Sequence, residues 1–366
     1  MIRYYQIENF KSLRYFSTPL EHLNLFLGLN GSGKSSVIQS LLLLRQSYSH
    51  NNRSSLDSLV LNNHLVSLGS AKDVMCQTSE DNFIRFVVGF ERDRVVDVSF
   101  SYDSEGSSYL TRLHTGKNDF LDNSLFGDSF FALAADHIGP RKQYDFSRWD
   151  MGGSDYLGIH GEYVVPYLAY NGDSYRVPEK LCNEHGKSEL LLDQVSAWIS
   201  TVSPGARIKT QLSELEQTVK LLVSFEGDRL ISPDFSPVNV GFGISYVLPL
   251  VVELLISQKD SLILIENPES HLHPKGQVAM AQLIAKAAAN GAQVICETHS
   301  DHLINGIRVA VKNDMIACKD VTLSYFDKNE KQETIVDGIK MDSNGSIDHY
   351  PYGFLDEWGE QLSKLL

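Results

Sequence analysis

A glycine-rich segment near the N-terminus has the residue types and the spacing of a phosphate-binding loop. Residues 28–35 read GLNGSGKS and satisfy the pattern GxxxxGK[ST]. The segment lies between two apolar runs, 23–27 and 37–44, which predict the strand and the helix that this motif requires. Glycines at positions 28, 31 and 33 permit positive φ angles, so successive N–H groups can point at phosphate oxygens in front of the helix N-terminus.

The motif therefore predicts a nucleotide site. We expect Lys34 to reach the β and γ phosphates and the hydroxyl of Ser35 to bind Mg²⁺. The alternative is a glycine-rich turn before a helix, but from average residue usage a chance match in a chain of this length has odds on the order of one in a hundred. The nucleotide-binding candidates in this loop are Asn30, Gly31, Ser32, Gly33, Lys34, Ser35 and Ser36.

A second group of polar side chains follows two apolar runs in the C-terminal half. Residues 261–265 end on Glu266, and residues 292–296 lead into the segment ETHS, which contains His299. Both runs have the pattern of buried parallel strands, whose carboxyl ends form the sheet edge where ligands bind. With a phosphate loop upstream, Glu266 can hold Mg²⁺ directly or through water, and His299 can sense the γ-phosphate.

Strands and helices alternate along this part of the chain. Helices are expected at 275–290, closed by Gly291 as a C-cap, and at 301–310. This alternation predicts an α/β fold with a mostly parallel sheet flanked by helices. Two further apolar segments, 83–90 and 95–102, are separated by a charged turn and predict antiparallel strands.

Composition limits the class of protein. The chain has 366 residues with 32 Lys and Arg against 46 Asp and Glu, a formal net charge of −14. This charge argues against a uniformly basic nucleic-acid surface and leaves a local basic patch open. The longest apolar stretch, 246–256, is far shorter than the roughly 20 residues that span a bilayer. No signal-peptide core or CxxC pair occurs, so we expect a cytoplasmic protein with free thiols and no membrane contact.

Taken together, these segments resemble the ABC-type ATPase heads related to SMC, RecF and OLD proteins, and among them the stand-alone prokaryotic AAA15/AAA21-like ATPases. The matching segments stand in the family's order and span nearly the whole chain. They are 7–12 (IENFKS), 28–35, 240–245 (VGFGIS), 262–274, 297–300 and the tail from Gly353 to Trp358. The resemblance implies a homodimer with two ATP molecules sandwiched between the phosphate loop of one subunit and the signature helix of the other.

The resemblance also assigns roles to individual residues. Lys11 and Ser12 become candidates for nucleotide binding, and Asp73 becomes a candidate for contacting magnesium-bound water, so the metal candidates are Ser35, Glu266 and Asp73. The signature candidates are Gly241, Gly243 and Ser245. Two glycines permit close approach, and a helix N-terminus with a serine offers donors to a γ-phosphate. The alternative is a helix N-terminus that packs against a neighbouring element.

One position departs from the family. In the family, the Asp that binds magnesium is usually followed by a catalytic Glu. This chain instead has Glu266 followed by Asn267. The amide of Asn267 cannot accept a proton from the attacking water. Either Glu266 or Glu269 is the base of a modified site, or the protein is an ATP-bound clamp. We favour slow but real hydrolysis. The catalytic candidates are Glu266, Asn267, Glu269 and His299.

The histidines near these residues allow a competing interpretation. His271, His273 and His299, with Glu266 and Glu297, could form a transition-metal cluster. We disfavour it because the HxH spacing does not place two ligands on one helix face and no other motif supports it. In the ABC-type interpretation, the loop at 270–273 runs along the dimer interface.

The order of the motifs predicts the domain organisation. We expect an N-terminal ATPase lobe with an antiparallel β-sheet at 1–140, an inserted helical lid at 141–235, a C-terminal ATPase lobe at 236–340 and a tail at 341–366. Helices are expected in the lid at 161–170 and 189–201. The heptads of an SMC coiled coil are absent, and too few residues follow the last strands for an OLD-type nuclease domain.

The favoured function is a regulatory ATPase that controls a separate effector, such as a nuclease, in prokaryotic anti-phage defence. The first alternative is an ATP-bound scaffold with little turnover. The second is a RecF-like head that senses DNA, which predicts a basic groove. The cationic candidates for such a groove are Lys11, Arg14, Arg141, Lys142 and Arg148.

Overall fold

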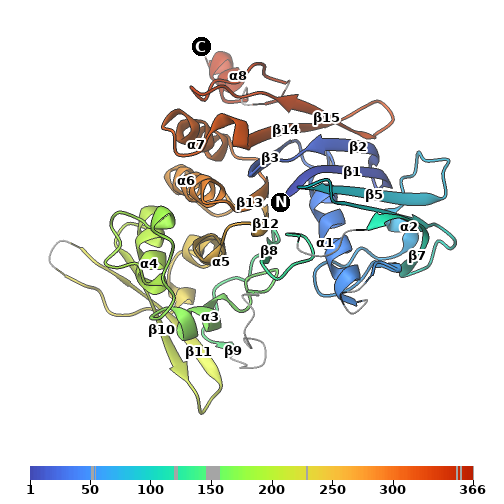
Figure 1. Ribbon diagram of the computed structural model, residues 1–366. Coiled ribbons are helices and arrows are strands. Elements are labelled where there is room, and N and C mark those ends of the chain that lie inside the picture. The colour runs from blue at the N-terminus through green and yellow to red at the C-terminus, as the bar shows by residue number, and fades with distance from the viewer. Residues whose placement is uncertain are drawn as a thin grey trace. The chain divides into compact units, whose positions relative to one another are not determined.

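The computed structural model describes residues 1–50, 53, 55–118, 123–145, 157–227, 230–351, 353–354 and 357–365. The chain divides into two compact units. Figure 1 labels their helices and strands. Unit 1 comprises residues 1–127, 319–342 and 346–366, and unit 2 comprises residues 128–318 and 343–345. Arg148, one of the cationic candidates, lies outside the described residues.

Unit 1 contains an antiparallel sheet with the strand order β2-β1-β5-β6-β7-β4. The two predicted strands are present as β5 and β6, and alternate residues along β6 are buried, which is the pattern of a half-buried strand. On the more exposed face, Arg85 forms a bidentate pair with Asp97 at 2.9 and 2.8 Å. The strands are β1 Ile2–Phe10, β2 Leu13–Pro19, β4 Ser58–Val60, β5 Phe83–Phe90, β6 Val95–Ser101 and β7 Tyr109–Asn118.

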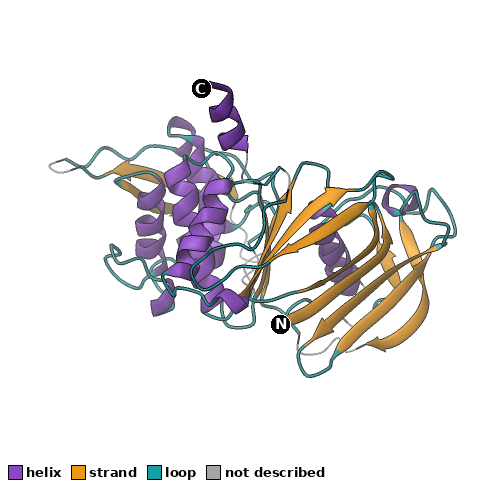
Figure 2. Cartoon of the chain, turned by 90° about the horizontal axis from the view of Figure 1, so that it is seen from above, coloured by secondary structure: helices purple, strands orange, loops and turns teal. Residues whose placement is uncertain are grey.

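The remaining strands of unit 1 include both parallel and antiparallel pairs. Strand β3 (Leu23–Gly28) pairs in parallel with β14 (Val321–Lys328), which pairs in antiparallel with β15 (Thr334–Ile339). Helix α1 (Lys34–His50) follows β3 and packs beside the antiparallel sheet, as Figure 2 shows, with a buried hydrogen bond of 2.7 Å between Tyr5 and Ser40. The other helices of unit 1 are α2 Ala71–Val74 and α8 Glu357–Leu365.

Unit 2 contains the predicted parallel strands. Strand β12 (Leu262–Glu266) pairs in parallel with β8 (Phe130–Leu133) and with β13 (Gln293–Glu297). The apolar residues of β12 and β13 are fully buried, as expected of strands covered on both faces. These pairings and the helices confirm the predicted α/β fold with parallel strands, flanking helices and an antiparallel sheet. The helices that follow these segments are α5 Phe242–Ile256, α6 Pro274–Ala289 and α7 Asp301–Lys312.

Local signals explain the ends of these helices. The side chain of His273 caps α6, Pro274 occupies its first turn, and Gly291 follows it with φ of 103°. Gly291 therefore has the C-cap conformation that the sequence predicts. The hydroxyl of Ser300 accepts a hydrogen bond of 3.0 Å from the N–H of Leu303 and caps α7.

The segment expected to be a helical lid is not only helical. It contains α3 (Val164–Asn171) and α4 (Leu191–Val202) near the predicted positions, but also a three-stranded antiparallel sheet with the order β10-β11-β9. Its apolar residues alternate with polar ones at a period of two, a hairpin pattern that the helical prediction overlooked. The strands are β9 Tyr144–Asp145, β10 Ala206–Ser213 and β11 Thr218–Phe225, and the 3₁₀ turns are η1 Glu179–Leu181, η2 Pro237–Asn239 and η3 Cys318–Asp320.

Unit 2 includes this segment together with most of the predicted C-terminal lobe, so the predicted boundaries at 140 and 235 are not the limits of the compact units. Over the part of the chain that the structure describes, every helix is too short or too polar to cross a membrane.

Candidate nucleotide-binding site

The predicted site residues fall into both units, and each unit contributes its own set. The phosphate loop, Lys11, Ser12 and Asp73 belong to unit 1. The signature candidates, the residues after β12 and His299 belong to unit 2.

The phosphate loop connects β3 to α1, as the motif requires. Gly28, Gly31 and Gly33 have φ angles of 127°, 75° and 109°, so all three adopt the positive φ expected from the sequence. At Gly28 the restriction is also steric, because a Cβ atom there would lie 2.2 Å from the backbone oxygen of Phe326. The loop therefore has the curled backbone in which N–H groups form an anion-binding concavity in front of a helix N-terminus.

The lysine of the loop is buried. Lys34 is 2% exposed, and its Nζ donates hydrogen bonds of 3.0 Å to the carbonyl oxygen of Gly28 and 2.8 Å to that of Leu29. These carbonyls hold the ammonium group inside the loop. Nearby in the sequence, the buried Oγ of Ser32 has no hydrogen-bond partner among the described residues. A buried unpaired hydroxyl is costly, and a phosphate oxygen is a partner that would satisfy it.

A threonine from the C-terminal part of the chain joins the loop to the first β-turn. The Oγ1 of Thr334 donates a hydrogen bond of 2.7 Å to the carbonyl oxygen of Ser32 and lies 2.8 Å from the Oγ of Ser12. Lys11 occupies the same turn with φ of 52°, and its Nζ donates to the side chain of Gln39 on α1 at 2.5 Å. Ser12 and Lys11 thus lie next to the phosphate loop and α1. Thr334 was missed because nothing in its local sequence marks it.

Asp73 has a local structural role. Its Oδ2 accepts hydrogen bonds from the N–H and from the hydroxyl of Ser70, at 2.8 and 2.7 Å, and so stabilises the start of α2. The hydrogen bond from the Ser70 backbone is the main cause that lowers the pKa of this carboxyl. A magnesium role for Asp73 stays a prediction.

In unit 2, Glu266 is the last residue of β12, at the carboxyl end where the sequence predicts it. Its Oε2 accepts a hydrogen bond of 3.2 Å from the N–H of Ala135. The next residue, Asn267, has φ of 49° and donates its N–H to the carbonyl oxygen of Glu297 at 2.9 Å. Asn is among the residues that tolerate this left-handed conformation best. Its buried Oδ1 has no hydrogen-bond partner among the described residues.

Glu269 holds the segment that carries His299. One carboxylate oxygen accepts from the hydroxyl of Thr298 and the other from the N–H of His299, both at 2.7 Å. A second link joins the hydroxyl of Ser300 to the amide oxygen of Gln277 on α6 at 2.5 Å. The loop after β12 and the loop after β13 are therefore tied together by side chains. This geometry explains Glu269 as a residue that positions His299.

The signature candidates lie at the start of α5. Gly241 is the exposed N-cap, and the Oγ of Ser245 is buried without a hydrogen-bond partner among the described residues. A Cβ atom on Gly243 would lie 3.0 Å from the backbone oxygen of His271. The His271 ring also lies 4.3 Å from the ring of Tyr246, measured between centroids. The N-terminus of α5 thus packs on the loop after β12, which is the alternative that the sequence left open, and still exposes Gly241.

The histidines in this region have structural contacts. The ring of His271 packs on Tyr246, and the Nδ1 of His273 caps α6. Within the described ranges, no group of three or more His, Cys, Asp and Glu side chains could hold a metal ion. Of the cationic candidates for DNA binding, Arg14 forms an ion pair with Asp81 at 3.0 Å, and Arg141 and Lys142 are exposed in unit 2.

Comparison with known families decides the classification. Residues 23–305 match the model of a family described as "AAA domain, putative AbiEii toxin, Type IV TA system". The chain belongs to this AAA family. Residues 316–365 of the AAA protein match a second family model, described as a protein of unknown function (DUF3696). Among curated proteins, no sequence matches the chain.

Solved structures show the fold of the AAA protein. It is similar to an SMC head crystallised with the C-winged helix domain of ScpA, with a TM-score of 0.55 and 15% identity over 93% of this chain and 98% of that one. It is also similar to the Smc head domain with an extended coiled coil, bound to the C-terminal domain of ScpA, from Pyrococcus furiosus, with a TM-score of 0.51 and 13% identity over 100% and 99% of the two chains. The AAA protein therefore has the fold of SMC heads, as the resemblance to ABC-type ATPase heads predicted.

Proposed function

We propose that this AAA protein binds ATP with Mg²⁺ and hydrolyses it slowly. The observation that carries the proposal is the phosphate loop, in which three glycines with positive φ surround a lysine that is 2% exposed. The buried atoms fit nucleotide and its metal: the hydroxyls of Ser32 and Ser245 can donate to phosphate oxygens, and the Oδ1 of Asn267 can accept from metal-bound water. None of the three has a hydrogen-bond partner in the described structure. Each of them belongs to a segment that the resemblance assigns to nucleotide. Buried polar atoms of this kind need an explanation, and bound nucleotide supplies one.

Each residue has a chemical task in this proposal. Lys34 binds the terminal phosphates, and Ser35 holds the metal ion. Glu266 contacts the metal ion through water, and His299 contacts the γ-phosphate. Magnesium supplies positive charge that neutralises the phosphates during transfer. Glu269 is unsuited as the base, because both of its oxygens accept hydrogen bonds from the segment that it positions. Glu266 is then the carboxylate available after β12, since Asn267 cannot accept the proton of water. A single carboxylate in place of the family's two supports slow turnover.

We further propose that the protein forms an ATP-dependent homodimer and controls a separate effector in anti-phage defence. The exposed Gly241 and the 60% exposed Phe242 at the start of α5 support a role in contacting a second subunit. Solved SMC heads of the same fold are bound to ScpA domains, which supports control of a partner protein. The family description names a toxin of a type IV toxin–antitoxin system, which supports a defence setting.

A phosphate-release assay tests the ATPase proposal with wild-type protein, Lys34→Ala, Glu266→Gln and the control Lys312→Ala, which alters an exposed residue at the end of α7. We expect release by wild type and by the control, and loss of release in the other two variants. Size-exclusion chromatography with ATP should show Glu266→Gln as a dimer, because it binds nucleotide without consuming it. If wild type releases no more phosphate than Lys34→Ala, with DNA and partner candidates present, the ATP-bound scaffold is the correct function.

A further inference from the structure

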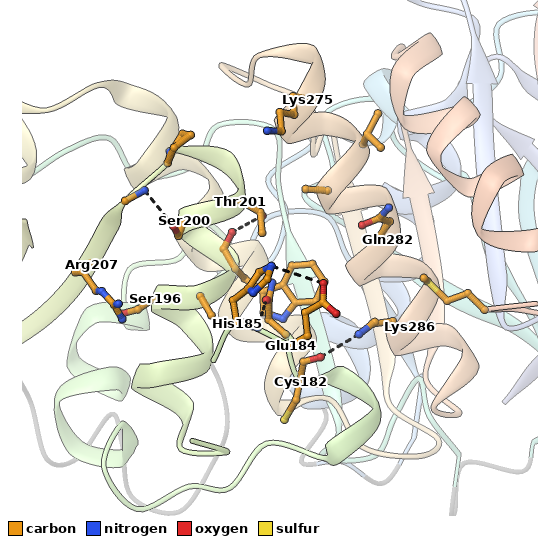
Figure 3. A pocket seen from close by; sticks show the side chains of 18 residues that line it. Cys182, Glu184, His185, Ser196, Ser200, Thr201, Arg207, Lys275, Gln282 and Lys286 are labelled. Carbon is orange, nitrogen blue, oxygen red and sulfur yellow. Dashed lines mark hydrogen bonds and ion pairs between the residues drawn. The ribbon is translucent and has the colours of Figure 1, made fainter. Parts of the chain in front are cut away.

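A groove of about 840 Å³ lies in unit 2 between helices α4 and α6 and the loop after η1 (Figure 3). The nucleotide-binding candidates do not line it. Its apolar surface includes Ala197 and Trp198 of α4 and Val278 and Ala279 of α6. Its volume is within the range of sites that bind small molecules or short peptide segments.

Lys286 is the most unusual residue of the groove. Its Nζ donates a hydrogen bond of 2.9 Å to the carbonyl oxygen of Cys182 and lies 5.4 Å from the centre of the Trp198 ring. Among the described residues it has no carboxylate partner within ion-pair distance. Desolvation in the groove is the main cause that lowers the pKa of its ammonium group. A half-buried cation in this position is stabilised by an incoming anion.

Lys286 is one of three polar residues on the same side of α6. Lys275, Gln282 and Lys286 are separated by seven and four residues, which places them in one row along a helix with 3.6 residues per turn. All three line the groove, and Figure 3 shows them at successive heights along the helix. Lys275, like Lys286, forms no ion pair within the described part of the chain. The row therefore presents two ammonium groups and an amide.

The other charged groups of the groove are already paired. Arg207 forms an ion pair with Glu226, and His185 lies 3.6 Å from Glu184. Two unpaired lysines thus dominate the charge of this groove in a protein with a net charge of −14. The groove is complementary to an acidic partner, which the rest of the protein would repel.

The spacing of the lysines limits the occupant. Their Cα atoms are 11 residues apart on α6, which corresponds to about 16.5 Å along the helix. An extended chain rises about 3.3 Å per residue and alternates its side chains between two faces. Two carboxylates on the same face lie four or six residues apart, about 13 or 20 Å, and the long lysine side chains can reach either spacing. We propose that this groove binds an extended acidic segment of a partner protein, with two carboxylates four or six residues apart on Lys275 and Lys286 and an apolar side chain of the same face between them on Ala197 and Val278.

Nucleic acid fits the groove less well than a peptide. A polyanion carries a charge at every phosphate and needs a continuous row of cations, whereas this groove has two unpaired lysines with an apolar surface between them. This inference goes beyond the proposed function and does not depend on ATP hydrolysis.

Fluorescence anisotropy with the full-length protein tests the proposal. The probes are fluorescein-labelled peptides of Ser and Leu that contain two glutamates separated by three, four or five residues, and a matched peptide with two lysines. We expect the peptides with three or five intervening residues to bind better than the peptide with four, whose glutamates face opposite sides of an extended chain, and the lysine peptide not to bind. Lys275→Glu and Lys286→Met should each weaken binding by about tenfold, and the control Lys312→Glu should leave it unchanged. Phosphate release by Lys286→Met should equal that of wild type.

Three results would overturn the proposal. The first is that no glutamate peptide binds saturably up to millimolar concentration. The second is that Lys275→Glu and Lys286→Met bind the peptides as well as wild type does. The third is that a single-stranded oligonucleotide of equal charge displaces the best peptide and binds more tightly, which would assign the groove to nucleic acid. A loss of phosphate release in wild type would refute the ATPase proposal alone and leave the peptide measurements interpretable.

Discussion

Substitutions of Glu269 distinguish between two roles for this residue. It either positions His299 or accepts a proton from the attacking water. Its two carboxylate oxygens accept hydrogen bonds from Thr298 and from the N–H of His299, both at 2.7 Å. Glu269→Ala removes both acceptors and leaves two donors without a partner. Glu269→Gln keeps one acceptor and turns an amide N–H toward the other donor, so it should have a smaller effect than the alanine variant.

The magnitude follows from these two hydrogen bonds. A hydrogen bond to a charged group contributes about 1.5–3 kcal/mol, and water can replace part of it at a half-buried site, so we expect Glu269→Ala to lower the free energy of unfolding by about 2–3 kcal/mol. Glu269→Gln should cost about half of that. Because the segment with His299 becomes less ordered, turnover should fall by about tenfold in both variants, not to zero. Thr298→Val removes one of the donors and should reproduce part of both effects.

Denaturant unfolding and phosphate release, measured on the same preparations, test this prediction. Glu330→Ala is the matched control, because it removes an exposed glutamate from another part of the chain. The reasoning is refuted if Glu269→Gln abolishes turnover without any loss of stability while Thr298→Val behaves as wild type. That combination would identify Glu269 as the general base.

Two further predictions concern backbone conformation and a buried charge. Gly28→Ala should lower the free energy of unfolding by about 4 kcal/mol or more, because the new Cβ meets the Phe326 oxygen at 2.2 Å, whereas Gly31→Ala, with nothing within 4 Å, should cost about 1 kcal/mol. Equal losses in denaturant unfolding would contradict this difference. Burial raises the pKa of Glu253 well above its ordinary value, so its carboxyl favours folding below the unfolded pKa, and that contribution is lost as pH rises through the folded pKa. Glu253→Gln should therefore unfold at higher denaturant than wild type at pH 8, and the difference should vanish near pH 4; a constant difference across this range would disprove it.

The phosphate loop was predictable because its chemistry is local. A positive φ at Gly28, Gly31 and Gly33 and a helix that begins at Lys34 depend on residues within a few positions of each other. The same holds for the caps of α6 and α7, where one side chain bonds the backbone two or three residues away. Strand ends were also predictable, since the apolar run ends at Ile265, one residue before the end of β12.

The hairpin of β10 and β11 shows where the sequence misled. Buried apolar residues recur at a period of two in β11, at Val219, Leu221 and Val223, but the expectation of a helical lid took precedence over that pattern. This region contains strands as well as helices because β10 and β11 pair with each other. The helical interpretation rested on the flanking segments and did not consider such pairing.

Sequence alone determined the phosphate loop, the acid at the end of β12 and the alternation of strands and helices from 261 to 310, because each depends on periodicity or on conformations within a few residues. Only the tertiary structure decided which distant side chains support them. Thr334 bonds Ser32 across 302 positions in the chain, and Glu269 bonds Thr298 across 29. Such contacts form between elements that meet only when the sheets are assembled, so no local pattern encodes them. The groove with Lys286 has the same origin, since α4 and α6 are far apart in the sequence.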